Sequence, residues 1–300
     1  MFLLNKLIGK SNDNIDKSEI KRILRYASDL HLERLPSLSS VNGLYDFKKQ
    51  KDTRYFLAIP GDIGNFEMLE IFLKAVSPVY ERVFFVPGNH EFFYHYNGKV
   101  FMTMDEINDR LQKICSKFDN VSFLNNGYYQ LDEYRIIGST FWTKIGKEES
   151  QRIASSWPDY GCIFIRDDNN PAGKRLVLPK DITMIHEQSV HYIYELLHST
   201  PEGGKNVVLT HHAPLYSDKS KEIYTSNPDH IGSPITNVFQ SDQSAWMTED
   251  NKIKIWIFGH THYCTKFTFN NVLVASNQLG YQSKDIGFQI NEHIILDQIN

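Results

Sequence analysis

The chain has 300 residues, of which 41% are hydrophobic and 23% are charged, and its formal net charge is −4. This length and apolar content allow a large core without disulfides, so the composition indicates a globular protein. A slight acidic excess argues against a general nucleic-acid binder, which carries a basic surplus or a basic stripe. No apolar run approaches the roughly 20 residues that span a bilayer, so we expect no membrane segment.

The start of the chain and the cysteines bear on location. Residues 1–20 are interpreted as a polar N-terminal extension before a domain over 21–300, with a docked helix as the alternative. Lys6 divides the first apolar residues, and no small-residue cleavage site follows them. The odd number of cysteines, without a CxxC motif, indicates reduced thiols and predicts a cytoplasmic protein.

Short apolar runs bounded by turn residues predict the strands of a buried sheet. In chain order they lie at 22–28, 55–60, 82–87, 206–210, 254–258, 266–269 and 272–275, with a last strand near Phe288 or at 294–296. Apolar residues at helical spacing predict helices over 65–75, 104–118 and 181–197. The segment 143–180 is rich in charge, Gly, Asn and Pro without a clear period, so we expect a long excursion over the site.

Polar clusters follow five of the predicted strands. In α/β sheets ligands bind at the carboxyl ends of strands, so we expect these clusters to meet. Oxygen and imidazole ligands suit divalent Mn, Fe, Co, Ni or Zn. Seven candidate ligands are too many for one ion and suit two ions bridged by a shared carboxylate. Each cluster alone has an ordinary explanation as a turn or cap, and the ordered combination is what indicates a metal site. The clusters are Asp29-x-His31, Gly61-Asp62, Gly88-Asn89-His90-Glu91, His211 and Gly259-His260-Thr261-His262.

These clusters, in this order from residue 29 to 262, resemble the motifs of the calcineurin-like metallophosphoesterase family: D-x-H, G-D, G-N-H-[DE], H and G-H-x-H. The resemblance implies a four-layer α/β/β/α sandwich, in which two mixed β-sheets pack face to face and are flanked by helices. It also implies two divalent metal ions, Mn²⁺ or Fe and Zn. Asp29, His31 and His262 would bind the first ion, Asn89, His211 and His260 the second, and Asp62 would bridge both.

The resemblance also assigns roles around the ions. His90 would face the substrate and protonate the leaving oxygen or stabilise charge on the phosphoryl group, and Glu91 would orient His90. The two cations would neutralise the phosphoryl oxygens and activate a water for in-line attack. His212 would lie behind the ligands or face the substrate, and His95 would line the pocket. A plain structural or surface role is the alternative for both.

The sequence therefore predicts a dinuclear-metal-dependent phosphoesterase that hydrolyses mono- or diester bonds of a small or nucleotide-type substrate. The arginines that the phosphoprotein phosphatase branch carries after its G-D and G-N-H-E motifs are absent after Asp62 and Glu91, which argues against a protein phosphatase. A nuclease would need a basic groove. A non-catalytic, protein-binding scaffold on the same fold is the remaining alternative, although scaffolds tend to have lost ligands that this chain retains.

Overall fold

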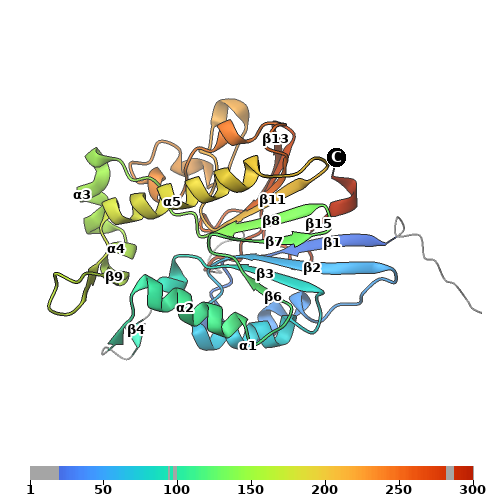
Figure 1. Cartoon of the computed structure of the whole chain (residues 1–300), viewed down its shortest axis with the longest axis horizontal. Coiled ribbons are helices and arrows are strands. Elements are labelled where there is room, and N and C mark those ends of the chain that lie inside the picture. Colours follow the sequence, from blue (N-terminus) through green and yellow to red (C-terminus); the bar gives the residue numbers. More distant parts are fainter. Residues whose placement is uncertain (1–19, 94, 97–99, 282–286, 300) are drawn as a thin grey trace, which may run out of the picture.

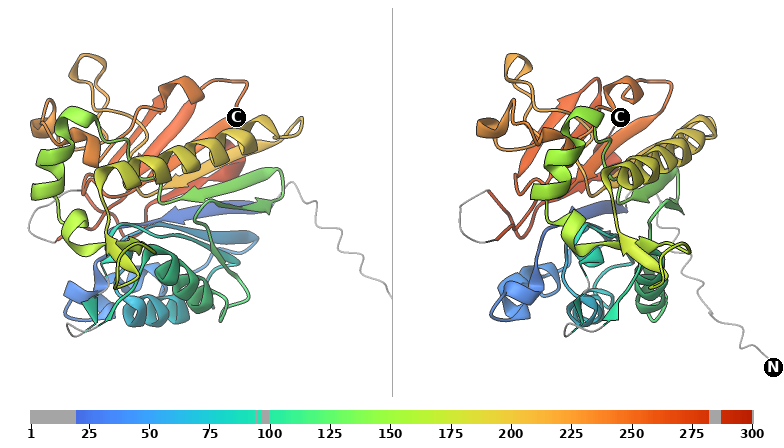
Figure 2. Two further views of the ribbon diagram at one scale, coloured as in Figure 1. Left: turned by 60° about the vertical axis from the view of Figure 1, so that its left-hand side comes forward. Right: turned by 90° about the vertical axis from the view of Figure 1, so that its left-hand side faces the viewer.

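Two β-sheets packed face to face form the centre of the protein, and helices cover the outer face of each sheet (Figure 1). The computed structural model describes residues 20–93, 95–96, 100–281 and 287–299. Helices α1 and α2 lie against one sheet and the long helix α5 lies against the other, as the turned views also show (Figure 2). The protein therefore has the four layers helix, sheet, sheet, helix.

The first sheet has the strand order β15-β1-β2-β3-β6. Strands β1, β2, β3 and β6 are parallel, and β15 runs antiparallel to β1. Its strands are β1 (Lys21–Tyr26), β2 (Thr53–Pro60), β3 (Arg82–Val86), β6 (Val121–Phe123) and β15 (His293–Ile295).

The second sheet has the order β13-β14-β12-β11-β8-β7. Its four central strands are parallel, and the two edge strands β13 and β7 are antiparallel to their neighbours. Its strands are β7 (Gly127–Leu131), β8 (Tyr134–Ser139), β11 (Lys205–Thr210), β12 (Ile253–Phe258), β13 (Thr265–Phe269) and β14 (Val272–Ser276).

The helices of these layers and two small hairpins complete the fold. The helices are α1 (Phe66–Val76), α2 (Met104–Cys115), α3 (Lys147–Ser156), α4 (Asp159–Cys162) and α5 (Pro179–His198). The hairpins are β4 (His95–Tyr96) with β5 (Val100–Phe101), and β9 (Phe164–Arg166) with β10 (Lys174–Leu176). None of the helices in these described ranges is long and apolar enough to cross a bilayer.

Alternating side chains along the strands divide the apolar residues into three layers. On β2, Phe56 and Ala58 point between the two sheets, whereas Leu57 and Ile59 point toward α1 and α2. On β12 the same alternation holds, because residues 255 and 257 point between the sheets and residues 256 and 258 point toward α5. Since every central strand is covered on both faces, it reads as a continuous apolar run.

The helix boundaries follow from local capping. The side chain of Asn65 accepts a hydrogen bond from the backbone N–H of Met68 at the start of α1. Thr103 and Glu106 form a reciprocal capping box at the start of α2. Helix α5 begins at Pro179, where the missing N–H costs nothing, so it starts two residues before the predicted range. Helix α2 ends at Cys115, three residues before the predicted end.

The structure confirms the predicted fold class and adds elements that the sequence pattern missed. Strands β6, β7 and β8 lie in a stretch for which no strand was predicted, although β8 is central to the second sheet. The segment 143–180 contains α3, α4, β9 and β10. Helix α3 buries only Ile153, so its apolar periodicity is too weak to recognise. The predicted extension over residues 1–20 lies almost wholly outside the described residues.

We expect Leu209→Ala to lower the free energy of unfolding by about 2–5 kcal/mol, because Leu209 is completely buried between the sheets and truncation leaves a cavity. Met184→Ala on the outer face of α5 is the control, since Met184 is 58% exposed and the expected change is about 0.5 kcal/mol or less. Urea unfolding of both variants measures the difference. Equal losses would contradict the assignment of Leu209 to the core between the sheets.

Candidate metal centre

The loops that follow β1, β2, β3, β11 and β12 leave the same end of the sandwich and are joined by backbone hydrogen bonds. The N–H of Asp29 donates to the carbonyl of Gly61 (3.0 Å), which ties the loops after β1 and β2. The N–H of His260 donates to Asp29 Oδ1 (3.0 Å), which joins the second sheet to the first. The polar clusters that are separated in the sequence therefore meet at one place.

The predicted ligands form two groups that share a neighbour. The ligand atoms of Asp29, His31 and His262 lie within 4.8 Å of one another, and so do those of Asp62, His211 and His260. Oδ2 of Asp62 lies 3.5 Å from Nε2 of His211 and 3.9 Å from Nε2 of His31. One oxygen of Asp62 therefore faces both groups, which is the position that a bridging carboxylate needs.

Backbone carbonyls fix which nitrogen of two imidazoles carries the proton. His211 Nδ1 lies 2.9 Å from the carbonyl oxygen of Pro60, and His260 Nε2 lies 3.1 Å from that of Val238. A carbonyl only accepts, so these two nitrogens carry the hydrogens. The opposite nitrogens, His211 Nε2 and His260 Nδ1, are consequently lone pairs, and they lie 3.1 Å apart.

Asn89 adds a third acceptor to these two. Its Oδ1 lies 3.0 Å from His211 Nε2, and its Nδ2 donates to Asp159 at 2.9 Å. The three atoms Asn89 Oδ1, His211 Nε2 and His260 Nδ1, which we call the acceptor cluster, have no hydrogen to share between them. Lone pairs that face one another in a buried site repel unless a cation lies between them, so the donor set fits a divalent metal ion.

The titration behaviour of the buried groups also fits a cation. Burial raises the pKa of Asp62 well above its usual range, and the charges of Glu91 and Asp29 add to this shift. Burial lowers the pKa of His211 to about 4 and lowers the pKa of His260 well below its usual value. These imidazoles are therefore neutral at neutral pH, the form that coordinates metals, and a nearby cation would favour ionised Asp62.

The ligands lie on unusual backbone. Five of the seven predicted ligands have a positive φ, although none of them is glycine: 52° at Asp29, 43° at His31, 55° at Asp62, 69° at His260 and 49° at His262. Left-handed backbone costs non-glycine residues free energy and concentrates at functional sites. The strained turns aim successive side chains inward from the strand ends.

Gly61 and Gly88 allow the loops after β2 and β3 to touch. A Cβ added to Gly61 would lie 2.6 Å from the Cα of Gly88, and one added to Gly88 would lie 2.1 Å from Asp62 Oδ1. Any side chain at these positions would displace Asp62 or His211. The glycines are thus required by close approach of backbone to ligand.

Glu91 stabilises these loops rather than the imidazole of His90. Its buried carboxylate accepts hydrogen bonds from the backbone N–H groups of Asp62 (2.9 Å), Ile63 (2.7 Å), Gly64 (3.3 Å) and Gly88 (2.6 Å). Burial raises the pKa of Glu91 to about 7, although these four hydrogen bonds oppose the shift. The expectation that Glu91 orients His90 is corrected on this basis: all its recorded hydrogen bonds come from backbone amides of the two loops.

His90 lies at the open edge of the site. Its backbone N–H donates to Asp62 Oδ1 (2.9 Å), which leaves Oδ2 of Asp62 facing the two ligand groups. Its Nε2 lies 3.1 Å from the hydroxyl of Tyr281. Burial, with a contribution from His31, lowers the pKa of His90 to about 3. Because the predicted ligands other than His262 are buried, substrate would approach along the edge formed by His90, Tyr281 and the partly exposed His262.

His212 and His95 were also predicted to lie at the site, and the structure describes the side chain of His212 but not that of His95. His212 is 1% exposed and lies behind the ligands, with its ring 4.3 Å from that of His260 and 5.3 Å from that of Trp142. Its Nδ1 lies 3.0 Å from the carbonyl oxygen of Thr140. This buried position does not face substrate, and it fits either a place behind the predicted ligands or the plain structural role. The side chain of His95 lies outside the described part of the structure.

Three residues outside the motifs also reach the site. Oε1 of Glu33 lies 3.7 Å from His31 Nδ1, a buried atom without a hydrogen-bond partner among the described residues. The ring of Tyr281 lies 4.6 Å from that of His31 and 4.5 Å from that of His262. Asp159 bonds Asn89 from α4. Glu33 follows the first motif closely and Tyr281 follows the last strand, but no pattern in the sequence marks Asp159.

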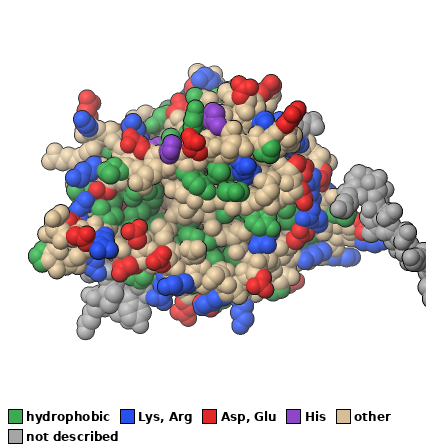
Figure 3. All heavy atoms as spheres, in the orientation of Figure 1, with side chains coloured by type: hydrophobic (Ala, Val, Ile, Leu, Met, Phe, Trp, Pro, Cys, Tyr) green, Lys and Arg blue, Asp and Glu red, His purple; other side chains and the backbone are tan. Residues whose placement is uncertain are grey.

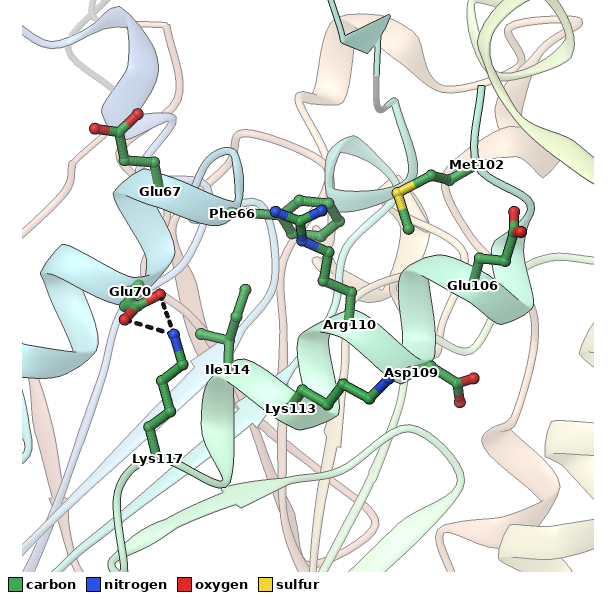
Figure 4. Close-up of a pocket in the computed structure, with 10 residues that line it drawn as sticks. All are labelled: Phe66, Glu67, Glu70, Met102, Glu106, Asp109, Arg110, Lys113, Ile114 and Lys117. Atoms are coloured by element: carbon green, nitrogen blue, oxygen red, sulfur yellow. Dashed lines mark hydrogen bonds and ion pairs between the residues drawn. The ribbon is translucent and has the colours of Figure 1, made fainter. Parts of the chain in front are cut away.

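Of two hollows at the surface, one is lined by none of the predicted ligands and the other adjoins them. One of about 680 Å³ lies between α1 and α2 and is lined by charged side chains of both signs, including the ion pair of Lys117 with Glu70 (Figure 4). No predicted ligand lines it. Another, of about 300 Å³, adjoins the predicted ligands through Phe239, whose ring is 5.3 Å from that of His260, and through Thr261.

Comparison with known proteins agrees with this geometry. A family model described as calcineurin-like phosphoesterase matches residues 26–264. A protein of Acanthamoeba polyphaga mimivirus, described as uncharacterized protein L509, is 38% identical over 283 residues, which are 93% of this chain and 98% of the relative. The crystal structure of phosphopantetheinyl hydrolase (PptH) from Mycobacterium tuberculosis has a TM-score of 0.69 at 15% identity, covering 93% of this chain and 98% of that chain, and so has a similar fold.

We expect Glu91→Gln to lower the free energy of unfolding of the metal-free protein by about 2–6 kcal/mol. Each carboxylate oxygen accepts two backbone N–H groups, so whichever way the glutamine amide turns, two buried donors lose their acceptor at about 1–3 kcal/mol each. Urea unfolding at mildly alkaline pH measures the loss. Glu202→Gln in an exposed loop is the control, and a Glu91→Gln chain as stable as this control would restore the interpretation that Glu91 serves His90 alone.

Proposed function

The chain belongs to the calcineurin-like phosphoesterase family of metal-dependent hydrolases, and from this premise we propose that it hydrolyses phosphate esters of small or nucleotide-type molecules with two divalent metal ions. The observation that carries the proposal is the acceptor cluster. His211 Nε2 lies 3.0 Å from Asn89 Oδ1 and 3.1 Å from His260 Nδ1, and none of these three acceptor atoms carries a hydrogen that could join them, so a cation between them would stabilise the arrangement.

The ions would be held by the seven predicted ligands, which are the six residues of the two groups together with Asn89. Asp29, His31 and His262 would hold one ion, and Asn89, His211 and His260 the other, with Asp62 between them. Imidazole with carboxylate and amide oxygen suits Mn²⁺, Fe or Zn. When bound, the two cations would neutralise the phosphoryl oxygens and make a water acidic enough to act as the nucleophile.

The protein's own side chains supply the rest of the chemistry. His90 lies beside Asp62 at the open edge, where its neutral imidazole can donate a hydrogen bond to an ester oxygen, or protonate that oxygen once the negative charge of a bound phosphate has raised the low pKa of His90. The hydroxyl of Tyr281 contacts His90 Nε2 and so holds the ring at this edge. Glu91 would act through the loops, by keeping Asp62 and Gly88 in place.

The surroundings of the site favour a small substrate. The hollow of about 300 Å³ beside His260 has the volume of a small-molecule pocket. On the face drawn in Figure 3, Lys and Arg side chains are mixed with Asp and Glu side chains. The mixture of charges on this face and the net charge of −4 give no support to a nuclease, which uses a continuous basic surface. The retained ligands and His90 favour catalysis over a scaffold role.

We expect protein loaded with Mn²⁺ to contain two ions per chain and to cleave aryl phosphates, and we expect chelation by EDTA to abolish this activity reversibly. Asp62→Asn removes the negative charge shared by both groups, so Mn²⁺ binding should weaken by at least about tenfold, the loss seen even for outer-sphere partners. Metal analysis and Mn²⁺ titration measure both effects. Fewer than two ions in the loaded wild-type protein would refute the dinuclear proposal.

Two leaving groups separate the possible roles of His90. If His90 protonates the leaving oxygen, His90→Ala should reduce kcat by about 10²-fold or more for an alkyl ester but much less for a 4-nitrophenyl ester, because nitrophenolate leaves without a proton. If His90 instead stabilises the phosphoryl group, His90→Ala should reduce kcat by the same factor for both esters. Steady-state kinetics of matched ester pairs decide between the roles.

His191→Ala on the exposed face of α5 is the matched control and should leave both rates unchanged. Mn²⁺ stoichiometry of the His90→Ala protein must remain that of the wild type, since His90 is not assigned as a ligand. A His90→Ala protein that binds its metals and keeps full activity on both esters would remove His90 from the mechanism.

A further inference from the structure

A buried carboxylate from outside the motif loops contacts one of the proposed ligands. Asp159 is the first residue of α4, a short helix within the segment 143–180 (Figure 1). Its side chain is buried, with 5% exposure, and its Oδ1 accepts the hydrogen bond from Asn89 Nδ2 at 2.9 Å. The contact spans 70 residues of sequence. A buried carboxylate is costly unless it is paired, so this position calls for an explanation.

The contact decides which end of the Asn89 amide faces the metal site. A side-chain amide has a donor end and an acceptor end of nearly equal size. An ionised carboxylate accepts hydrogen bonds and cannot donate them, so the NH₂ end of Asn89 must face Asp159. The oxygen end is then directed at His211 Nε2, 3.0 Å away.

Without Asp159, the opposite orientation would be favoured in the absence of metal. His211 Nε2 is a lone pair, because Nδ1 donates to the carbonyl of Pro60. An Asn89 amide turned by half a revolution would donate its NH₂ to that lone pair and satisfy both groups. It would also remove two metal ligands together, since the amide oxygen would point away and the His211 nitrogen would be occupied. Asp159 opposes the turned orientation, because in that orientation the Asn89 amide oxygen would face the carboxylate oxygen of Asp159.

We propose that Asp159 is a positioning residue of the metal centre, which holds the Asn89 amide in the orientation that binds the ion. The inference rests on the proposed function, in that the acceptor cluster binds a divalent ion. The segment 143–180 thereby becomes part of the metal centre, although it contributes no ligand. Outer partners of this kind orient metal ligands, and their loss weakens binding by about 10–100-fold.

The effect is confined to one of the two ions. Asn89 belongs with His211 and His260, whereas Asp29, His31 and His262 have no contact with Asp159 among those recorded for the described residues. Loss of Asp159 should therefore weaken one Mn²⁺ site and leave the other close to its original affinity. A role in folding alone would lower stability and leave the affinities of both sites unchanged.

The test compares Mn²⁺ titrations of the full-length wild type, Asp159→Ala and Asp168→Ala. Asp168 lies in the same segment, is exposed and pairs with Arg166 at the surface, so its variant controls for loss of a carboxylate. We expect Asp159→Ala to bind one Mn²⁺ with affinity within about twofold of wild type and the other about 10–100-fold more weakly. Electron paramagnetic resonance distinguishes a coupled Mn²⁺ pair from a single ion and reports which state is present.

A charge exchange keeps the test decisive if Asp159→Ala does not fold. Asn89→Asp places two carboxylates at the contact and should weaken the second Mn²⁺ site, because the like charges drive them apart. Adding Asp159→Asn supplies an NH₂ group that donates to the new carboxylate, with the donor and acceptor exchanged. The double variant should therefore bind the second ion more tightly than Asn89→Asp alone.

Each outcome has a separate meaning. Wild-type protein that binds fewer than two ions refutes the proposed function. The inference about Asp159 fails alone if the wild type binds two ions and Asp159→Ala binds both ions with the affinities of the wild type. It also fails if the double variant binds the second ion no more tightly than Asn89→Asp alone. Selective weakening in Asp159→Ala, or rescue in the double variant, supports it.

Discussion

The geometry of the proposed metal centre depends on hydrogen bonds that point away from it. The carbonyls of Pro60 and Val238 hold the outward nitrogens of His211 and His260, which forces the inward nitrogens to be lone pairs. Pro60 ends a strand of the first sheet, and His211 follows a strand of the second. Packing of the two sheets therefore sets the tautomer of a proposed ligand. Second-sphere partners that fix a ring in this way also fix where the ion can lie.

The same strand ends impose a steric condition. The loops that carry Asp62 and Asn89 approach so closely that only glycine fits at positions 61 and 88. Glu91 satisfies four backbone N–H groups at this contact, which would otherwise be buried without acceptors. A ligand loop, a glycine and a buried carboxylate thus form one unit, and a change in any of them moves Asp62.

Prediction from sequence succeeded where the information is local. Each central strand with a polar motif at its end is a short apolar run, and each motif sits within a few residues of its strand, so both the sheets and the meeting of the polar clusters could be predicted. Strand β8 was missed because it ends without such a motif, and its neighbour β7 alternates between exposed and buried residues at the sheet edge. Asp159 could not be found, since its role depends on a contact 70 residues away that no local pattern encodes. The role of Glu91 was misjudged for a related reason: its partners are backbone amides, which no side-chain motif displays.

The metal-free site works against the stability of the fold. Five strained ligand residues cost about 1–3 kcal/mol each, and the lone pairs of the acceptor cluster face one another without a hydrogen. Three apolar layers and the hydrogen bonds of Glu91 offset these costs, because they hold the strand ends from both sides. Rigid support of this kind prevents the ligands from turning toward partners of their own, as the Asn89 amide would do without Asp159. An ion entering such a site meets ligands that are already oriented, so little of its binding free energy is lost in ordering them.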